Sequence, residues 1–505
     1  MNRPWWQDAV VYQIYPRSFA DTDGDGIGDL RGIVERLGYL RSLGVDALWI
    51  SPFFRSPMAD FGYDVSDHTA VDPVFGTDAD AEELIAAAHA GGLRILVDIV
   101  LPHTSDRHPW FRAAATSRSA PMRDFYVWRD SGPDGGPPNN WVAGFPPDSP
   151  AWTWHPETGQ WYLHSHLPQQ PDLDWSNPAV RQAQLDVLRF WLDRGVDGVR
   201  LDSINRLGKD PGYRDNVDGL PSRQRDWPTL HDYLREVRTL VDKYPDAVAV
   251  GEVWEFDQRR ILPYVAPGEL HLAHNFVFSG LPFDAAAIRA TVQEFLDLAG
   301  EDVWPAWFLG NHDIPRVVSR WGGQAAGRLA AMLLLTLRGT PFLYQGEELG
   351  LPDTELPPGV GEDRNGRDPQ RTPMPWTAGP GHGFSTGTPW LPLGATAGRL
   401  NVESELADPG STLCLYRELL ALRRRRPSLR AGTQVFTDGP PGVLAYLRAT
   451  EEERSLVVLN LAPTGRSLPW DSALVPLVST GDVTLGDGVT LGPCAGAVFD
   501  AQACG

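Results

Sequence analysis

The chain has 505 residues, of which 42% are hydrophobic and 22% charged, values typical of a globular protein with one large domain and one or two smaller ones. Its formal net charge of −21 argues against binding to nucleic acid or to an anionic membrane, because both would repel it, and fits a neutral substrate. Most of the 19 Trp and 13 Tyr side chains are expected in the core, but so many flat aromatic faces also offer surfaces on which sugar rings stack.

The cysteines and the apolar segments indicate the compartment. Cys414, Cys494 and Cys504 show no paired spacing, which favours free thiols in a reducing compartment; a bridge between Cys494 and Cys504 is the alternative. Residues 1–8 lack the apolar core of a signal peptide, and the longest apolar run, residues 330–337, is too short to span a bilayer. We therefore expect a cytoplasmic protein.

An acidic loop follows the first predicted strand, residues 10–14. It carries Asp at loop positions 1, 3, 5 and 9 and Gly at position 6, which repeats the ligand spacing of calcium loops. Position 12 is Gly32 rather than the bidentate Glu of an EF-hand. Closely spaced carboxylates repel one another without a cation, so the loop predicts a bound Ca²⁺ or Mg²⁺, with a solvated acidic turn as the alternative. The predicted ligands are Asp21, Asp23, Asp25, Ile27 and Asp29.

Strand-like and helix-like segments alternate along most of the chain, which is typical of parallel strands joined by helical crossovers. The expected strands are residues 10–14, 47–50, 94–100, 195–205, 247–251, 274–278, 305–310 and 341–344. The expected helices include residues 33–43, 79–90, 178–194, 229–243 and 413–425. Eight such strands predict an α/β fold, a (β/α)₈ TIM barrel.

Two regions interrupt or follow this alternation. Residues 104–175 are rich in Pro, Gly and Trp and lack helical periodicity, which predicts an inserted subdomain after strand 3 rather than a loop. Near the C-terminus, short alternating runs predict a small antiparallel β domain. We therefore expect the barrel in residues 1–103 and 176–428, the inserted subdomain in 104–175 and the C-terminal β domain in 429–505.

Polar side chains end several of the predicted strands, where TIM barrels place their active sites. These side chains are Asp98, His103, Arg200, Asp202, Glu252, His312 and Asp313. Arg200 and Asp202 are two residues apart in a strand and share a face, so the guanidinium would keep that carboxylate ionised; a plain structural ion pair is the alternative. Acids gathered on one rim push their pKa values apart, so that one stays protonated while another stays ionised.

Several segments together resemble a known family. The four signature regions of the α-amylase superfamily, glycoside hydrolase family 13, are similar to residues 98–103, 198–203, 251–254 and 308–313. A further signature of that family is similar to residues 170–174. Its α-glucosidase and oligo-1,6-glucosidase branch is similar to this chain in residues 5–19, 21–29 and 366–376. The resemblance covers almost the whole chain.

Carried over residue by residue, the resemblance implies three catalytic acids. Asp202 would be the nucleophile, Glu252 the general acid/base, and Asp313 the acid that binds sugar hydroxyls and stabilises the transition state. Arg200 would hold Asp202 ionised. The mechanism would be retaining, with two carboxyl groups about 5–5.5 Å apart and a covalent glucosyl-enzyme.

The resemblance also implies a substrate-binding set. His103 and His312 would donate hydrogen bonds to hydroxyls of the glucose being cleaved. Tyr63 would stack on that sugar, and Asp64 would hold its non-reducing end. Arg399 would pair with Asp64 to close the pocket. The early metal site would be structural, and no organic cofactor is expected.

Three positions depart from the family pattern. Ser203, directly after the nucleophile, resembles α-1,4-active members, whereas a bulky Val accompanies α-1,6 activity. His166 stands where many relatives carry an aromatic ring, and Phe145 is a candidate to replace that ring. Pro102 precedes His103 where relatives often carry Asn, so no metal contact from Asn is expected there.

The resemblance implies a retaining, exo-acting α-glucosidase that releases glucose from the non-reducing end of short α-glucosides. Maltose-type α-1,4 linkages would be preferred, with sucrose as a further substrate and transglucosylation as a competing outcome. The alternatives are an oligo-1,6-glucosidase, a sucrose-isomerising or glucosyl-transferring enzyme, and an inactive binding subunit, against which the three retained acids argue. The expected partner is a small oligosaccharide or glucoside, with no nucleic acid and no membrane, and the expected state is a monomer or weak homo-oligomer.

Overall fold

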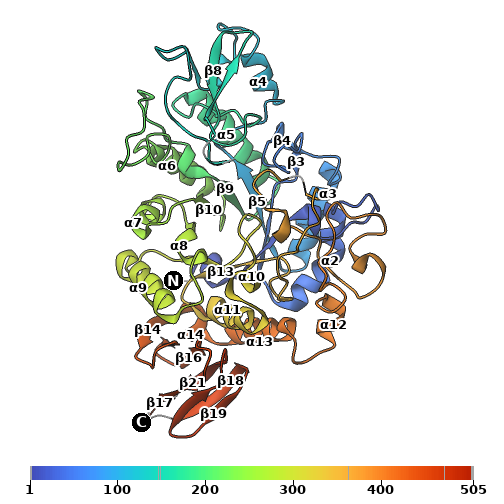
Figure 1. The fold of residues 1–505 in the computed structure, drawn as a ribbon, viewed down its shortest axis with the longest axis vertical. Helices are drawn as coiled ribbons and strands as arrows, with labels where there is room; N and C mark the ends of the chain where they lie inside the picture. Colours follow the sequence, from blue (N-terminus) through green and yellow to red (C-terminus); the bar gives the residue numbers. More distant parts are fainter. Residues whose placement is uncertain (1–2, 146, 148, 362, 471–472, 502–505) are drawn as a thin grey trace.

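The computed structural model describes residues 3–145, 147, 149–361, 363–470 and 473–501. Eight parallel strands close into a barrel in the order β1-β13-β12-β11-β10-β9-β5-β2, which confirms the predicted TIM-barrel fold (Figure 1). Almost every residue of these strands is buried, as expected where helices cover a parallel barrel. The strands are β1 (Val11–Ile14), β2 (Ala47–Ile50), β5 (Arg94–Val100), β9 (Gly198–Asp202), β10 (Val248–Val253), β11 (Leu272–Asn275), β12 (Ala306–Phe308) and β13 (Thr340–Tyr344).

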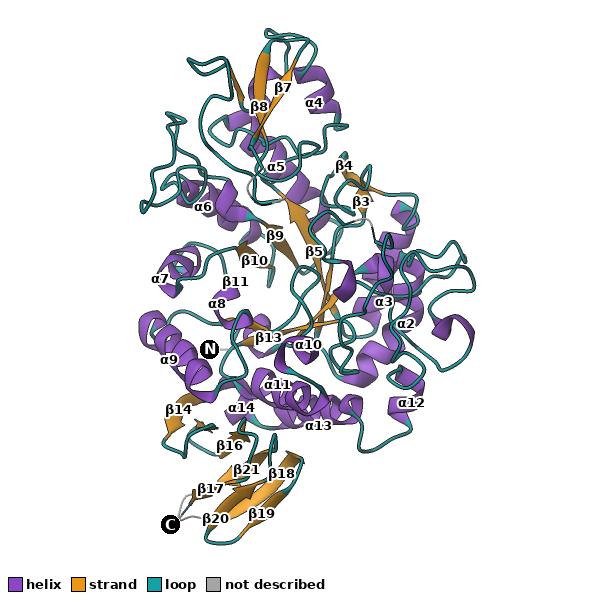
Figure 2. Cartoon of the chain, viewed as in Figure 1, coloured by secondary structure: helices purple, strands orange, loops and turns teal. Residues whose placement is uncertain are grey.

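Helices surround the barrel, and local signals set their ends (Figure 2). At the start of the first long helix, Asp29 accepts a hydrogen bond from the Gly32 amide, and Gly44 ends that helix at φ 101°, where glycine carries no steric penalty. The longer helices are α2 (Leu30–Leu43), α3 (Asp78–Ala90), α5 (Pro178–Leu192), α6 (Leu230–Val241), α9 (Ala285–Ala299), α11 (Gln324–Thr336) and α13 (Thr412–Arg425). The shorter ones are α1 (Trp5–Asp8), α4 (Pro109–Ala114), α7 (Gln258–Ile261), α8 (Phe276–Ser279), α10 (Val317–Trp321), α12 (Val402–Leu406) and α14 (Pro427–Ala431).

The sixth predicted strand is wrong in its second half. β11 ends at Asn275, and its remaining predicted residues form α8. The side chain of Asn275 accepts a hydrogen bond from the amide of Phe278, so this residue caps a helix instead of continuing a strand. The apolar run after Asn275 carries no period that separates the two structures.

The segment between β5 and α5 carries its own three-stranded antiparallel sheet, in the order β6-β8-β7. Its strands are β6 (Trp128–Arg129), β7 (Trp152–His155) and β8 (Gln160–Leu163), and a separate apolar cluster includes Trp141 and Trp152. This sheet and α4, a helix that the sequence did not predict, lie at the top of Figure 1. A short hairpin, β3 (Phe54–Arg55) and β4 (Asp67–Val71), precedes α3.

The C-terminal residues form two antiparallel sheets below the barrel (Figure 1), as the alternating pattern predicts. The five-stranded sheet has the order β14-β15-β16-β21-β18, and the three-stranded sheet has the order β17-β20-β19. The strands are β14 (Thr433–Thr437), β15 (Val443–Ala449), β16 (Arg454–Asn460), β17 (Arg466–Pro469), β18 (Leu474–Thr480), β19 (Val483–Leu485), β20 (Gly488–Leu491) and β21 (Gly496–Ala501).

Cys414 and Cys494 are free thiols, and Cys504, the alternative partner of Cys494, lies outside the described residues. Among the described helices, none combines the length and the apolar character needed to cross a bilayer.

Candidate active site

Arg200, on β9, lies fully buried beneath three carboxyl groups. Its Nη1 donates to Oδ1 of Asp202 and to Oδ1 of Asp98, each at 2.8 Å, and its Nη2 lies 2.8 Å from Oε2 of Glu252. The barrel register explains this meeting, because β5, β9 and β10 are adjacent and Gly251, before Glu252, pairs with Leu201, before Asp202. One guanidinium therefore orients acids from three neighbouring strands.

Ser203 joins β9 to a 3₁₀ helix, η3 (Ile204–Arg206), in the left-handed region, with φ 43° and ψ 40°. This conformation is uncommon for a residue with a side chain. It aims the Ser203 amide at Oε2 of Glu252, which accepts at 2.8 Å. The turn after the candidate nucleophile thus also orients the candidate acid/base. A strained backbone conformation of this kind is common at functional sites.

The acids over Arg200 differ in their affinity for a proton. Burial raises the pKa of Glu252 to about 8, and the charges of Asp202 and Asp313 add to this effect while Arg200 opposes it. Burial raises the pKa of Asp202 to about 6, with Arg200 again opposing. At neutral pH the first carboxyl group is therefore mainly protonated and the second mainly ionised, as acid–nucleophile chemistry requires.

Asp313, which follows β12, is held by two arginines. Its Oδ1 accepts from Nη1 of Arg367 at 2.8 Å and from Nη2 of Arg371 at 3.0 Å, and its Oδ2 lies 3.2 Å from Nε2 of His312. Burial alone would raise the pKa of Asp313, but His312 and the two arginines outweigh it and hold that pKa below its usual value. Asp313 is therefore ionised throughout the physiological range.

Aromatic rings form one wall of the site. Tyr63 stacks on His312 with an interplanar angle of 2° and a centroid distance of 5.2 Å. Its hydroxyl donates to Oδ2 of Asp98 at 3.0 Å, and Trp49 Nε1 donates to the same oxygen at 3.1 Å. Asp98 thus has a structural role: it fixes Tyr63 and Arg200.

A cavity of about 270 Å³ opens above these residues, and its lining includes Asp202, Glu252 and Asp313. At one end Arg367 Nη2 donates to Oδ1 of Asp60 at 2.6 Å while Nη1 of the same side chain reaches Asp313. These ion pairs form part of the cavity lining, beside the candidate transition-state acid.

The predicted residues His103 and Phe145 also line the cavity. His103 Nε2 lies 3.1 Å from the Tyr63 carbonyl oxygen, and its Nδ1 has no hydrogen-bond partner among the described residues. Phe145 stacks on His166 at 5.7 Å, and the guanidinium of Arg367 lies 5.2 Å from its ring centroid. Phe145 therefore supplies an aromatic surface next to His166, as the departure at His166 predicts.

The predicted pair of Asp64 and Arg399 is wrong. Asp64 is fully buried, and its carboxylate accepts from Ser56 Oγ and from the amides of Ala59 and Asp60, so it stabilises a turn. Arg399 is exposed and makes no ion pair with Asp64 in the described part of the chain. The physical reason is that the amides of the turn already satisfy the Asp64 carboxylate.

Asp60, Arg367 and Arg371 are the residues that the sequence reasoning missed. Asp60 lies four residues before Asp64. Both arginines lie in residues 366–376, a segment that resembles the family but to which the sequence analysis assigned no function. Two arginines four residues apart in a loop could have signalled an anion-binding pair, because acids at the barrel rim need counter-charges. The closing pair is Asp60 with Arg367.

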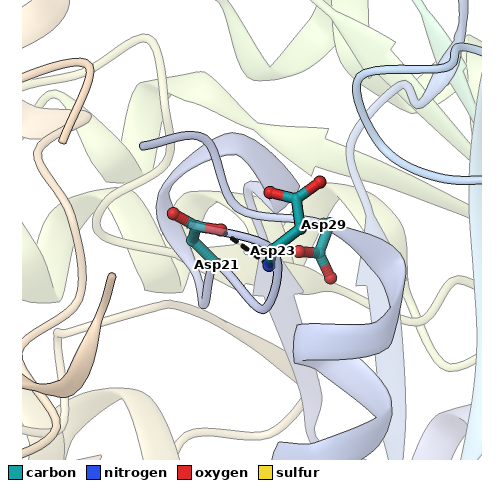
Figure 3. Close-up of side chains that lie close together, drawn as sticks. All are labelled: Asp21, Asp23 and Asp29. Atoms are coloured by element: carbon teal, nitrogen blue, oxygen red, sulfur yellow. Dashed lines mark hydrogen bonds between the residues drawn. The ribbon is translucent and has the colours of Figure 1, made fainter. Parts of the chain in front are cut away.

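The acidic loop before α2 gathers three of its predicted ligands (Figure 3). Carboxylate oxygens of Asp21, Asp23 and Asp29 lie within 4.8 Å of one another, a set of hard oxygen donors that fits Ca²⁺ or Mg²⁺. Asp25 is not part of this cluster, and its Oδ1 accepts from the amide of Ile27 at 2.7 Å. The cluster consists of carboxylates only, so a role for Ile27 as a ligand stays a prediction.

Residues 13–432 match the family model of the α-amylase catalytic domain. The chain therefore belongs to the α-amylase family, glycoside hydrolase family 13, in the branch that contains α-glucosidases and oligo-1,6-glucosidases. It is a glycoside hydrolase of the α-glucosidase type.

Relatives within this branch differ in their named substrates. The chain is 43% identical to a probable α-glucosidase of Rhizobium meliloti (strain 1021), over 96% of this chain and 94% of the relative. It is 39% identical to the trehalose-6-phosphate hydrolase of Escherichia coli (strain K12), over 93% and 92% of the two chains. The solved structure of an α-glucosyl transfer enzyme, XgtA, superposes with a TM-score of 0.94 at 41% identity and covers 99% and 100% of the two chains.

Proposed function

We propose that this protein is a retaining, exo-acting α-glucosidase that releases glucose from the non-reducing end of short α-glucosides. The observation that carries the proposal is the shared contact of Asp202 and Glu252 with one guanidinium, at 2.8 Å each, in the lining of one cavity. Two acids of unequal proton affinity in one pocket are what double displacement requires.

In the proposed first step, an oxygen of Asp202 attacks the anomeric carbon and forms a glucosyl ester, while the bond to the leaving oxygen breaks. Glu252 gives its proton to that oxygen, so the leaving group departs as an alcohol. In the second step Glu252, now ionised, takes a proton from water, and the resulting attack releases glucose and frees Asp202. Asp313 would stabilise the positive charge of the transition state through its hydrogen bonds to the sugar.

The ion pairs of Arg367 support attack at a chain end. Arg367 bridges Asp60 and Asp313 in the cavity lining, and in the proposed binding mode these side chains would block the space beyond the bound glucosyl unit. Asp60 and Arg367 replace Asp64 and Arg399 in this role. Tyr63, stacked on His312, would support the ring of the bound glucose.

The small side chain of Ser203 supports a preference for α-1,4 linkages. It lies directly after Asp202, beside the acid/base, where a larger residue would narrow the space for the leaving group. Sucrose is a further candidate substrate. A Ca²⁺ or Mg²⁺ ion bound by Asp21, Asp23 and Asp29 would be structural, since this loop precedes α2 and none of the three lines the cavity.

The direct test is incubation with maltose, isomaltose, sucrose and p-nitrophenyl α-glucoside, with every product resolved. We expect free glucose as the main product and maltose turned over faster than isomaltose. D202N and E252Q, matched in size to the native residues, should each lose activity. Absence of glucose release from all four compounds would refute the proposal.

Glucosyl transfer is the second candidate function, and the similarity to an α-glucosyl transfer enzyme favours it. In that reaction an acceptor hydroxyl replaces water in the second step. The same incubation separates the two: longer or isomerised sugars in excess of free glucose indicate transfer. An inactive binding subunit would release nothing.

A further inference from the structure

Arg206, the last residue of η3, is a buried cation that has no role in the proposed hydrolysis steps. It lies four residues after Asp202 and lines the same cavity, yet only 8% of the residue is exposed. Within the described residues its side chain forms neither a hydrogen bond nor an ion pair, and Nη1 is a buried donor without a partner. A buried, unpartnered guanidinium is costly, so a ligand that pairs with it is the natural explanation.

The acids near Arg206 are already engaged by other cations. Asp172 lies 3.0 Å from Lys209, Asp226 lies 2.9 Å from Arg260, and Glu255 lies 3.4 Å from Arg225 and 3.1 Å from Arg260. The nearby cations therefore outnumber these acids, and the charge of Arg206 is left over. Burial lowers the pKa of Arg206 to about 10, so the side chain is still charged at neutral pH.

Neighbouring polar groups in the same part of the cavity also lack partners. Both side-chain atoms of Asn205 are buried without a hydrogen-bond partner, and so is Nδ1 of His166. Asn205 and His166 line the cavity with Arg206. Three adjacent side chains thus present unused hydrogen-bonding capacity to one ligand.

If Glu252 is the proton donor, as proposed, these groups lie on the leaving-group side of the scissile bond, because Ser203 links them to that acid. The amide of Ser203 donates to Glu252, the proposed proton donor, and Ser203 Oγ lies 3.4 Å from Nε2 of His166. A Cβ added at Gly144, next to Phe145, would lie 2.9 Å from Nη2 of Arg206, so the guanidinium packs against that backbone. Arg367 and Asp60, which we propose to lie beyond the bound glucosyl unit, form a separate ion pair.

We propose that Arg206 binds an anionic group, a carboxylate or a phosphate, on the leaving group of the substrate. The inference rests on the proposed α-glucosidase function and narrows its substrate class to α-glucosides whose second half is negatively charged. The planar fork of a guanidinium matches both anions with paired hydrogen bonds, and the Asn205 amide would donate beside it. The net charge of −21 does not prevent such binding, because distant charges are screened beyond about 8 Å at physiological salt.

The test compares kcat/KM for substrates that differ only in charge. One arm uses 4-carboxyphenyl α-glucoside against its neutral isostere, 4-carbamoylphenyl α-glucoside. The second arm uses maltose phosphorylated on O6 of its reducing glucose against maltose. We expect the wild-type enzyme to prefer the anion by about 10-fold or more in at least one arm, since charge-assisted hydrogen bonds are about twice as strong as neutral ones. The preferred arm identifies the anion.

Variants assign the preference to one side chain. R206Q should lose it, whereas R223Q, which removes a charge in the neighbouring loop outside the cavity lining, should keep it. Retention of the preference in R206Q would overturn the proposal. If R206Q does not fold, competition in the wild-type enzyme decides: 4-hydroxybenzoate should inhibit more strongly than 4-hydroxybenzamide, and equal inhibition would overturn the proposal.

The outcomes also separate this inference from the proposed function. Turnover of the neutral substrates without any anion preference overturns the role of Arg206 and leaves the α-glucosidase function standing. Absence of turnover of every glucoside, neutral and anionic, refutes the proposed function itself.

Discussion

Two carboxyl groups that touch the same guanidinium hold protons with different strength. Asp202 and Glu252 both lie 2.8 Å from a nitrogen of Arg200, but Glu252 is also close to the negative charges of Asp202 and Asp313. The second of two neighbouring acids always ionises with more difficulty, and burial enlarges the difference. The assignment of acid and nucleophile therefore follows from position rather than from residue type.

The pH dependence of kcat/KM should be bell-shaped, with limbs near 6 and 8. Activity rises with pH as Asp202 loses its proton, and falls again as Glu252 loses the proton that the leaving group needs. Because Asp202 and Glu252 interact, the two apparent pKa values describe the pair of acids together rather than either residue alone. Initial rates on maltose, whose sugar leaving group needs a proton, measure both limbs across about pH 4–10. A profile that stays flat above pH 8 would contradict the role of Glu252.

Arg367 should be essential for positioning. R367Q removes the shared partner of Asp60 and Asp313. These two carboxylates, which line the cavity, would then no longer be held in place. We expect kcat/KM for maltose to fall about 100-fold, the effect of a small misplacement of reacting groups. R364Q, in the same loop but exposed, serves as the control and should resemble the wild type. Equal effects of the two substitutions would mean that the loss is not specific to the site.

At the scale of elements, the turn from β9 into η3 combines strain with selectivity. Ser203 occupies the left-handed region there, which costs a β-branched residue more than a serine. We expect S203V to lower the ratio of maltose to isomaltose kcat/KM by about 10-fold, the effect of a few added methyl groups in a pocket. S203A, which adds no bulk, is the matched control. An unchanged ratio in S203V would remove Ser203 from linkage selection.

The acidic loop would couple a bound ion to α2. Asp29 both belongs to the carboxylate cluster and caps α2, and Asp21 accepts a hydrogen bond from Ser385 in a distant loop. Removal of the ion with a chelator should lower Tm, and added Ca²⁺ should restore it. An ion at 100 times its Kd contributes about 2.7 kcal/mol. Differential scanning calorimetry measures the shift, and D21N should abolish the response. A Tm that ignores both chelator and Ca²⁺ would exclude the metal site.

At the scale of the whole molecule, the barrel was predictable because its strands are buried on both faces. Residues 47–50 are continuously apolar and residues 95–100 are apolar apart from Asp98, and both runs lie between helical periods, so the number and order of such strands follow from the sequence. The second half of the strand predicted at 274–278 is wrong because Asn275 caps a helix, a signal that an apolar run conceals. The helix α4 was missed because six residues in a Pro-rich segment show too little periodicity.

Some residues of the candidate site could be predicted from the sequence and others could not. Side chains at strand ends, such as Arg200 and Asp202, were predictable because the barrel register fixes where they meet. Asp60 and Arg367 were not, because they lie in loops 307 residues apart that only the folded chain brings together. Asp64 and Arg399 were predicted from the family resemblance, which matches positions along the chain and carries no information about how loops pack.

The proposed binding mode predicts which bond is cleaved in a long substrate. In the proposed binding mode Arg367 and Asp60 block the space beyond the glucosyl unit, so maltooligosaccharides should yield glucose as the first product at every chain length. A maltooligosaccharide whose non-reducing end carries an ethylidene block should resist cleavage. Chromatography of early products from the free and the blocked substrate tests this. Release of maltose or longer fragments from the blocked substrate would indicate a cleft that is open at both ends.

The covalent step is the most direct test of the account. E252Q should form a glucosyl-enzyme from α-glucosyl fluoride, because fluoride leaves without a proton, and should then hydrolyse it slowly, because the base is missing. Mass spectrometry of the quenched, digested protein should place one hexose on the peptide that contains Asp202. A hexose on another carboxylate, or no adduct while fluoride is released with inversion at the anomeric carbon, would contradict the assignment of Asp202 as nucleophile.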